Sequence, residues 1–536
     1  MIKITGTLPR YFLIALLLFF FPAGSVSSQE AAPFFDPQLL QWMRTDVSAP
    51  TGMPFSFEVR GDKKEIYGRM GPAMSTTGII ERTIVDQGIS IYDTALWQIA
   101  LSATDAPEDL AMAGKPVEHY WQGNLNDFNN IRSGSGGQIF VYDPASPELV
   151  TSSLSQQGRR GFIFRIMNAN GRYLSSDPLD GKASYEYFPN NPRIHWEDWK
   201  PIAGENAWVV MAALHLLMKK PTEERAEAVE LRLAEELARA AIILQAGNGG
   251  VRMAPLGTYF HLLDIPPGLS DAQIAQRLDD QAKDVNRQKL EAPAGALREF
   301  PAYHRWYYDE IATENNISWY AAFRMLYQVT GKDEYHQSMA RIEEYFKSVW
   351  DADNGVFYQG AHFTDGAWVS NFDPFAADVQ NWSLVVIGPA KIDAWFGEGA
   401  AYGIWKATKE FSGVADEQGK LQGVGFTKEN DRLSIEWTCG AILGTEKLAD
   451  YYASSHPSWA QDIEADIQSM RSGIEAYRFK MRDNEAAYSY SSRRGWIPFG
   501  WYSHEPGILS LASTAWVFLI DAHINPFEIT LPPIEK

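Results

Sequence analysis

Six short segments of this 536-residue chain share one pattern. In each, an acidic or hydroxyl residue is followed within a few positions by a tryptophan, and an apolar run with helical spacing continues from there. The polar residues and their tryptophans are Asp93 and Trp97, Glu205 and Trp208, Glu314 and Trp319, Asp378 and Trp382, Glu436 and Trp437, and Ser513 and Trp516. A helix that is apolar on nearly every side must be enclosed by other structure. The pattern therefore predicts six inner helices.

More polar helical segments lie between these six. Residues 222–245, 332–350, 390–411 and 458–479 place apolar residues three and four positions apart, with charged residues opposite. Two helices with their connections need roughly 40 to 65 residues, which fits the spacing of the later segments, whereas short-period solenoids need even spacing. We therefore predict an all-α fold, an (α/α)6 toroid of six helical hairpins in which an outer ring of helices covers the inner ring.

Two longer stretches lie in the first two gaps. Residues 105–200 contain short β-prone runs among Gly, Ser, Asn and Pro, which predicts a small β-rich insertion in the N-terminal part. Residues 254–303 contain a charged helical segment with proline-bearing flanks. We expect a single catalytic domain over residues 29–536 that carries these two insertions.

The N-terminus has the composition of a secretory signal. Lys3 and Arg10 precede an apolar run over residues 11–21, and small residues follow, so we expect a signal peptide over residues 1–28 with cleavage near Ser28. The run is too short to span a bilayer comfortably, so we expect no stable membrane insertion after cleavage. The chain has 1 cysteine and therefore no internal disulfide. An exported protein without disulfides is expected in a bacterial periplasm or outside the cell.

The charge of the chain excludes several classes of partner and chemistry. The formal net charge is −20, which repels phosphate backbones, so no nucleic-acid partner is expected. The histidines show no paired metal spacing, and no GxSxG elbow, Walker loop or dinucleotide fingerprint is present. We therefore predict no metal and no cofactor, and a neutral or cationic ligand. The sequence leaves the oligomeric state open.

Carboxylates at the starts of the inner helices are the candidate catalytic groups. If these helices run parallel, as alternation with outer helices demands, their acids meet at one end of the ring. Paired carboxyl groups can hydrolyse glycosidic bonds, one as acid and one as base or nucleophile. We expect Glu436, between two apolar residues, to be the protonated acid, and Asp378 and Glu314, at helix N-termini beside amides, to stay ionised. An alternative is that these acids only cap helices. The candidate catalytic residues are Glu314, Asp378, Glu436, Asp93 and Glu505.

Tryptophans and amides near these acids are the candidate substrate-binding groups. Indole faces can stack on sugar rings, and amides can bond to hydroxyl-rich ligands. For each tryptophan, packing between inner helices is the alternative. The candidates are Trp97, Glu205, Asn206, Trp208, Asn315, Asn316, Trp382, Trp437, Trp501 and His504.

Several of these windows resemble a known superfamily. The segments YDTALWQIAL, GENAWVVMAAL, TENNISWYAAF, DVQNWS, IEWTCGAIL and STAWVFLIDAHINPF are similar to the six-hairpin glycosidases, in particular to exported bacterial members. The resemblance covers roughly residues 80–527. It implies an (α/α)6 toroid, a carbohydrate substrate and acid/base carboxylates, with Asp93, Asn206, Glu314, Asp378 and Glu436 at the recurrent polar positions.

We therefore expect an exported glycoside hydrolase that cleaves a neutral, glucan-like oligo- or polysaccharide. The same toroid also hosts polysaccharide lyases and sugar epimerases, because fold alone does not determine function. A non-catalytic glycan-binding protein of the cell envelope is the third reading. A lyase would need arginines and lysines around its uronate substrate, and the six segments offer almost none.

Overall fold

The computed structural model describes most of the chain. The described residues are 34–70, 76–126, 142–143, 146–150, 161–171, 174, 194–255, 259–264, 307–371, 373–429, 431–481, 484–499 and 501–530. The predicted signal peptide and the charged helical segment expected within residues 254–303 lie outside them. Among the helices of the described part, none is long and apolar enough to cross a membrane.

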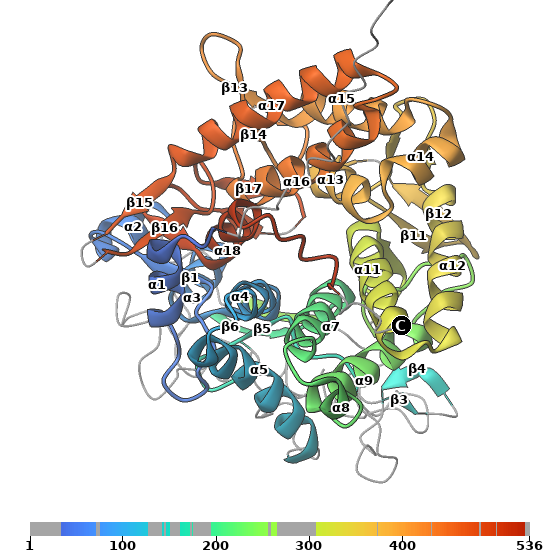
Figure 1. The fold of residues 1–536 in the computed structure, drawn as a ribbon. Helices are drawn as coiled ribbons and strands as arrows, with labels where there is room; N and C mark the ends of the chain where they lie inside the picture. The colour runs from blue at the N-terminus through green and yellow to red at the C-terminus, as the bar shows by residue number, and fades with distance from the viewer. Residues whose placement is uncertain are drawn as a thin grey trace, which may run out of the picture.

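Six helices form a closed ring, as Figure 1 shows. They are α4 (Ile91–Ala103), α7 (Ala203–Leu217), α11 (Thr313–Thr330), α13 (Ala377–Val386), α16 (Ile435–Tyr452) and α18 (Leu511–Asp521). Each packs against the next along the chain, and α18 returns to pack against α4. Nearly every side chain of α4, α7, α13 and α18 is buried. The predicted toroid and its six inner helices are confirmed.

An outer layer of helices covers the ring. Its members are α5 (Pro107–Asn126), α9 (Val229–Ile243), α12 (Asp333–Ser348), the pair α14 (Pro389–Phe396) and α15 (Ala400–Ser412), and α17 (Pro457–Glu475), each packed on the inner helix that precedes it. The sixth outer place belongs to the N-terminal helix α1 (Pro37–Thr45), which packs on α18. The two ends of the described chain therefore close the toroid together. The shorter helices are α2 (Lys63–Arg69), α3 (Thr76–Gln87) and α8 (Thr222–Arg225).

Short antiparallel strands lead the chain into the inner helices. β2 (Ile89–Ser90) runs directly into α4, β8 (Glu310–Ala312) into α11, and β19 (Ile508–Ser510) into α18. One sheet has the order β1 (Phe57–Val59), β19, β16 (Ala486–Ser489), β15 (Arg478–Lys480), and another has the order β12 (Ala367–Asn371), β11 (Gly360–Thr364), β8. The remaining strands form pairs: β9 (Trp350–Asp351) with β10 (Val356–Phe357), β13 (Gly413–Ala415) with β14 (Leu421–Val424), β17 (Gly495–Ile497) with β18 (Trp501–Ser503), β2 with β5 (Ile166–Met167), β3 (Tyr142–Asp143) with β4 (Ser146–Val150), and β6 (Ile194–Trp199) with β7 (Tyr259–Asp264).

The two expected insertions meet in the β6–β7 pair. Ile194 pairs with Asp264 and Trp199 with Tyr259, so the end of the first stretch lies beside the start of the second. Outer helix α5 occupies the beginning of the 105–200 range, and strands β3 to β6 follow it. The first gap thus holds an outer helix as well as short strands, and the division into domain and insertions stays a prediction.

The segment after α18 crosses the ring, as Figure 1 shows. It contacts the C-terminal parts of three inner helices, because His215 of α7 lies 3.0 Å from the Pro526 carbonyl oxygen, Arg324 of α11 donates to the Phe527 carbonyl, and Lys447 of α16 pairs with Glu528. This is the end of the ring opposite the inner-helix starts.

Candidate active site

Near its start, each inner helix carries one polar side chain that bonds the backbone carbonyl oxygen four residues earlier. These residues, called clasp residues here, are Thr94, Asn206, Asn316, Gln380, Thr438 and Thr514. Five of them also accept a backbone N–H from a segment outside the helix. Asn316, for example, accepts the Val251 N–H at 2.7 Å and donates to the Val251 carbonyl at 3.1 Å. The clasp residues fix the rotation of each inner helix about its own axis.

This rotation decides which acids face the middle of the ring. A helix turns about 100° per residue, so positions two before and two after a clasp residue share the side opposite to it. Glu314, Asp378 and Glu436 each stand two residues before a clasp residue. The three carboxylates therefore lie on the axial faces of α11, α13 and α16. Asp93 and Glu205 stand one residue before their clasp residues, about 100° away, toward neighbouring segments.

Aromatic rings fill the axis beyond the carboxylates. Trp208, Trp382 and Trp516 each stand two residues after a clasp residue, and their ring centroids lie 5.4, 5.9 and 6.1 Å apart. Phe527 of the C-terminal segment packs against all three, at 4.9, 5.3 and 6.1 Å. The C-terminal segment thus closes the ring with an aromatic contact at the end opposite the inner-helix starts.

Burial keeps the two axial glutamates protonated. Burial raises the pKa of Glu314 well above its ordinary value, and the negative charges of Asp378 and Glu205 raise it further. The hydroxyl of Ser318, which donates to Glu314 at 2.8 Å, opposes this only in part. Burial likewise raises the pKa of Glu436 to about 8. The acid role expected for Glu436 agrees with this direction, whereas burial and the charges of its acidic neighbours oppose the ionised state expected for Glu314.

Asp378 is the third axial carboxyl group with a raised pKa. Burial raises its pKa to about 7, and backbone N–H groups at the start of α13, including that of Val379 at 2.8 Å, oppose the rise. Its charge acts on both Glu314 and Glu436. The expectation of an ionised Asp378 stays a prediction, and the raised pKa of about 7 limits it to pH values above that.

Asp93 lies beside this trio. Burial raises its pKa to about 7, hydrogen bonds from Ser56 and Ser90 oppose the rise, and Glu205 adds to it. Asp93 also acts on Glu436, so it belongs to the same cluster of coupled carboxyl groups.

Tyr92 connects Glu436 to the aromatic rings at the axis of the ring of helices. Its hydroxyl lies 2.5 Å from Glu436 Oε1 and accepts the indole N–H of Trp516 at 2.9 Å. The Tyr92 ring packs edge-on against Trp208 at 5.1 Å. Tyr92 stands two residues before the clasp residue Thr94, in the axial position that acids occupy on α11, α13 and α16.

A cationic pair lies beside Glu205. Arg165 donates to Asp198 at 2.7 Å, and Lys200 lies 3.5 Å from the same carboxylate. Burial raises the pKa of Glu205, and Arg165 and Lys200 lower it in part. Burial lowers the pKa of Lys200 to about 8. These cations come from segments outside the inner helices, which is why the six segments alone did not reveal them.

Four predicted substrate-binding residues are buried against other groups of the protein. The indole N–H of Trp97 donates to the Met43 carbonyl at 2.7 Å and the ring is fully buried, because Trp97 stands three residues after its clasp residue and so faces outward. Asn206 and Asn316 are clasp residues whose amides bond backbone groups. Asn315 is buried over Gly204, where an added Cβ would lie 2.2 Å from the Asn315 Oδ1.

Of the other two predicted tryptophans, Trp437 is buried and Trp501 is half-buried. Trp437 packs against Phe426 at 5.0 Å and Phe499 at 6.0 Å. Trp501 is half-buried and donates its indole N–H to the Tyr490 hydroxyl at 2.9 Å. Burial raises the pKa of Tyr490 well above its ordinary value, and Glu436 raises it further, so Tyr490 also lies beside the carboxyl cluster.

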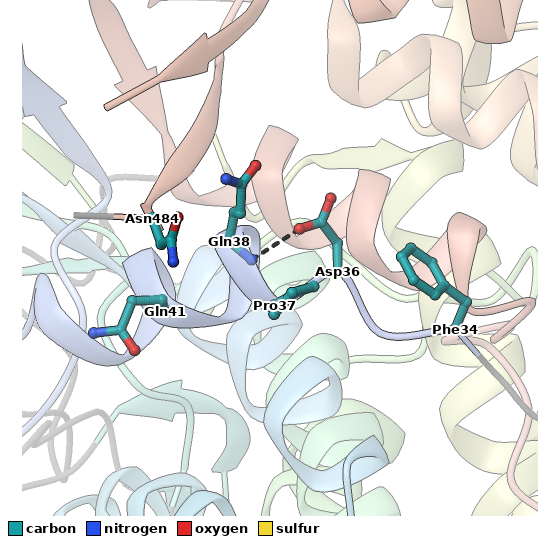
Figure 2. A pocket seen from close by; sticks show the side chains of 6 residues that line it. All are labelled: Phe34, Asp36, Pro37, Gln38, Gln41 and Asn484. Carbon is teal, nitrogen blue, oxygen red and sulfur yellow. Dashed lines mark hydrogen bonds between the residues drawn. The ribbon is translucent and has the colours of Figure 1, made fainter. Parts of the chain in front are cut away.

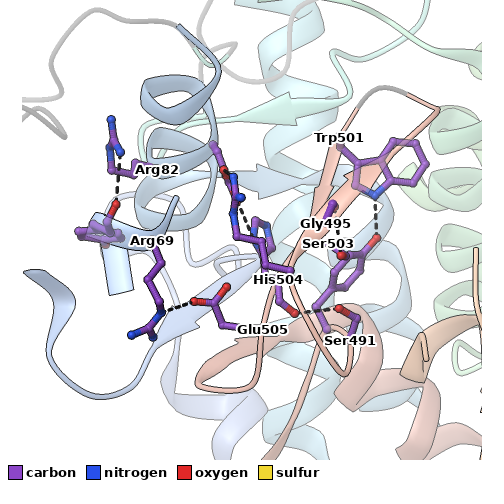
Figure 3. Close-up of polar contacts among 12 residues, drawn as sticks. Arg69, Arg82, Ser491, Gly495, Trp501, Ser503, His504 and Glu505 are labelled. Atoms are coloured by element: carbon purple, nitrogen blue, oxygen red, sulfur yellow. Dashed lines mark hydrogen bonds and ion pairs between the residues drawn. The ribbon is translucent and has the colours of Figure 1, made fainter. Parts of the chain in front are cut away.

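Glu505 and His504 form a separate polar cluster. Glu505 accepts the Nε hydrogen of Arg69 at 2.8 Å, and Figure 3 shows its side chain directed at Arg69. His504 is buried, with Nδ1 3.3 Å from Glu81 and its ring edge-on to Phe57 at 4.9 Å. Glu505 is thus engaged by Arg69, whereas the His504 ring also packs 5.9 Å from the Tyr490 ring.

A cavity of about 640 Å³ lies beside α1, as Figure 2 shows. Its lining residues are Phe34, Asp36, Pro37, Gln38, Gln41 and Asn484. Asp36 is already engaged, since it accepts the Gln38 N–H at 2.8 Å and pairs with Arg478 at 2.7 Å. The cavity therefore offers no free catalytic group. Within the described ranges, no group of three or more His, Cys, Asp or Glu side chains is arranged to hold a metal ion.

Comparisons with known proteins give fold similarity at low identity. No protein-family model matches the chain, and no curated protein matches it by sequence. A sugar epimerase from a ruminal bacterium is similar in structure, with a TM-score of 0.49 and 12% identity over 92% of this chain and 97% of that one. Cellobiose 2-epimerase from Bacillus thermoamylovorans has a TM-score of 0.48 and 11% identity, over 90% and 96% of the two chains. An inactive variant of an α-1,6-mannanase from Salegentibacter has a TM-score of 0.42 and 10% identity, over 90% and 96%. The closed ring of helices itself carries the assignment of the toroid.

Proposed function

We propose that the protein is a glycoside hydrolase in which Asp378 is the base and Glu436 the acid. The observation that carries the proposal is the axial cluster of Glu314, Asp378 and Glu436. Burial raises the pKa of Asp378 to about 7 and that of Glu436 to about 8, and the charge of Asp378 raises the pKa of both glutamates. Carboxyl groups whose pKa values are pushed apart in this way are suited to paired acid and base roles.

In the proposed reaction, the Glu436 proton moves to the glycosidic oxygen as the bond to the sugar carbon breaks. Ionised Asp378 takes a proton from the water that attacks that carbon. Glu314, protonated and half-buried, donates a hydrogen bond to a substrate hydroxyl. Trp501, which is half-buried, offers an aromatic face on which a sugar ring can stack.

A polysaccharide lyase is less well supported. Its base is commonly a tyrosine or histidine, which must give up a proton near neutral pH. Burial and the adjacent Glu436 raise the pKa of both Tyr92 and Tyr490 well above the ordinary value. A neutral glycan remains the best-supported substrate class, because the acidic cluster would repel uronate groups.

The test is a panel of neutral α- and β-linked glucans and mannans, incubated with wild-type protein and with Asp378→Asn and Glu436→Gln variants. We expect new reducing ends with wild type only, and a bell-shaped pH profile of kcat/KM with a maximum between about pH 7 and pH 8. The two limbs of this pH profile report apparent pKa values that belong to the coupled carboxyl groups together. Binding without any product would favour a glycan-binding protein, and conversion of an end sugar without chain cleavage would favour an epimerase.

We also propose that the protein is exported to the periplasm or beyond. The charged residues and apolar run before residue 29 support this. N-terminal sequencing of protein from cell fractions should give a start near residue 29, and an intact N-terminus in the cytoplasmic fraction would contradict export.

A further inference from the structure

We propose that Tyr92 and Trp516 hold the acidic proton of Glu436 on its Oε2 oxygen, so that Tyr92 is a positioning residue for the acid. The inference rests on the proposed role of Glu436. The geometry that carries it is the chain of contacts from the Trp516 indole to the Tyr92 hydroxyl and on to Glu436 Oε1.

The direction of each hydrogen bond follows from the donor groups. An indole N–H can only donate, so the Tyr92 oxygen accepts from Trp516 at 2.9 Å. The Tyr92 hydroxyl hydrogen then needs its own acceptor. Among the described residues, Glu436 Oε1 at 2.5 Å is the acceptor within reach. If Glu436 donated to Tyr92 instead, the Tyr92 hydrogen would lose this acceptor, which costs a hydrogen bond. Oε1 therefore accepts, and a protonated Glu436 carries its hydrogen on Oε2.

Packing holds this chain of contacts in place. Trp516 is fully buried, and its ring lies 5.9 Å from Trp208, 6.1 Å from Trp382 and 6.1 Å from Phe527. Three large neighbouring rings leave the indole little freedom to rotate. The Trp516 N–H therefore stays directed at Tyr92. Through Phe527, the C-terminal segment helps to hold the Trp516 indole, and with it the hydrogen bonds to Tyr92 and Glu436, in place.

The Tyr92 hydrogen bond opposes the effect of the acidic groups around Glu436 on its pKa. The titratable groups of the described residues that act with Glu436 are Tyr92 and Asp93 on α4, Asp378 on α13, Glu314 on α11, Tyr490 after β16 and Cys439 on its own helix. All of these are acids. Asp93 and Asp378 raise the pKa of Glu436, and the Tyr92 hydrogen bond lowers it.

This arrangement favours transfer of the proton from Glu436 to the glycosidic oxygen. When the Oε2 proton moves to the glycosidic oxygen, the electron pair of the breaking carbon–oxygen bond stays on that leaving oxygen. The negative charge left on Glu436 is met by the Tyr92 hydrogen, which is already directed at Oε1 and needs no reorientation. Water then supplies the hydroxyl group of the new sugar end, and its proton goes to Asp378.

The test uses Tyr92→Phe and Trp516→Phe in the full chain, with Tyr320→Phe and Trp405→Phe as matched controls. Tyr320 of α11 likewise accepts from a donor, Lys391 at 2.9 Å, and donates to a carboxylate, Glu343 at 2.7 Å, but both partners lie on outer helices. Trp405 is fully buried and donates to Asp466 at 2.9 Å. The readout is the infrared carbonyl band of protonated carboxyl groups, followed with pH. The Glu436 band is assigned by its loss in Glu436→Gln.

We expect the midpoint of the Glu436 band to rise by roughly one pH unit in Tyr92→Phe, because a bond that stabilises the carboxylate is lost. Trp516→Phe should shift it in the same direction by less, and the two controls should leave it unchanged. An unchanged or lower midpoint in Tyr92→Phe would overturn the proposal, and if that variant does not fold, an unchanged band in Trp516→Phe would do so. The infrared shift requires no turnover. If the variant shows the shift but the wild-type protein cleaves no glycan, the proposed hydrolase is contradicted. The hydrogen bond by which Tyr92 positions the Glu436 proton is then still supported.

Discussion

Replacing Glu436 by glutamine should stabilise the protein at alkaline pH and leave it nearly unchanged at acid pH. The substitution keeps the shape of the side chain and keeps an oxygen that accepts from Tyr92. In wild type, the folded state holds the Glu436 proton up to about pH 8, whereas the ordinary value is 4.5. The folded state therefore binds more protons than the unfolded chain between these values, and the free energy of unfolding falls as pH rises. Glutamine has no proton to lose, so its variant escapes this fall.

The magnitude follows from the change in pKa. Each unit corresponds to about 1.4 kcal/mol, so raising the pKa from 4.5 to about 8 disfavours the ionised folded state by on the order of 5 kcal/mol. Between about pH 5 and pH 8, the advantage of the variant should grow by on the order of 3 kcal/mol. Guanidinium unfolding at both pH values measures it, with exposed Glu223→Gln as the control. An advantage that is the same at both pH values, or larger at pH 5, would refute the reasoning.

Two further substitutions test the packing of the ring axis. Phe527→Ala removes the ring that contacts Trp208, Trp382 and Trp516, and it should cost about 3 to 5 kcal/mol of stability in a thermal or chemical melt; a loss within the error of the melt would mean that the C-terminal contact is dispensable. Gly440→Ala places a Cβ 2.6 Å from the Trp382 indole nitrogen, and it should destabilise the protein by about 1 to 3 kcal/mol. Its near-ultraviolet circular dichroism spectrum should change as well. In the control Gly403→Ala, the added Cβ meets no atom within 4 Å, so the variant should stabilise its helix slightly. Equal effects of the two alanines would count against the close approach of α13 and α16.

The sequence predicted the ring but not the rotation of its helices. The near-complete apolar character of the six segments was enough to place them inside, and the same pattern located all five acids near the helix starts. A shift of one position turns a side chain by about 100°. For this reason Trp97 faces α1 while Trp208 faces the axis, although both follow an acid closely. The clasp residues carry the signal that would have separated them, since each bonds the carbonyl four residues before it.

Other site features depend on contacts between distant parts of the chain. Tyr92 lies 344 residues from Glu436 in sequence, and nothing in its local window distinguishes it from a packing tyrosine. Arg165 and Lys200 come from the segments before α7 and meet Glu205 only in the folded chain. The raised pKa of Glu314 has the same origin, because burial and the charges of three other helices outweigh its helix-terminal position. Properties that arise from such convergence could not be predicted from single windows.

The central claim is that the axial carboxylates hydrolyse a glycan, and one measurement tests it most directly. The wild-type protein and the Asp378→Asn variant are incubated with the neutral glucan and mannan panel, and new reducing ends are counted against time. The account predicts release by wild type and a fall in kcat of roughly 10² to 10⁴-fold in the variant, the usual contribution of a general base. Equal rates for the two proteins would contradict it.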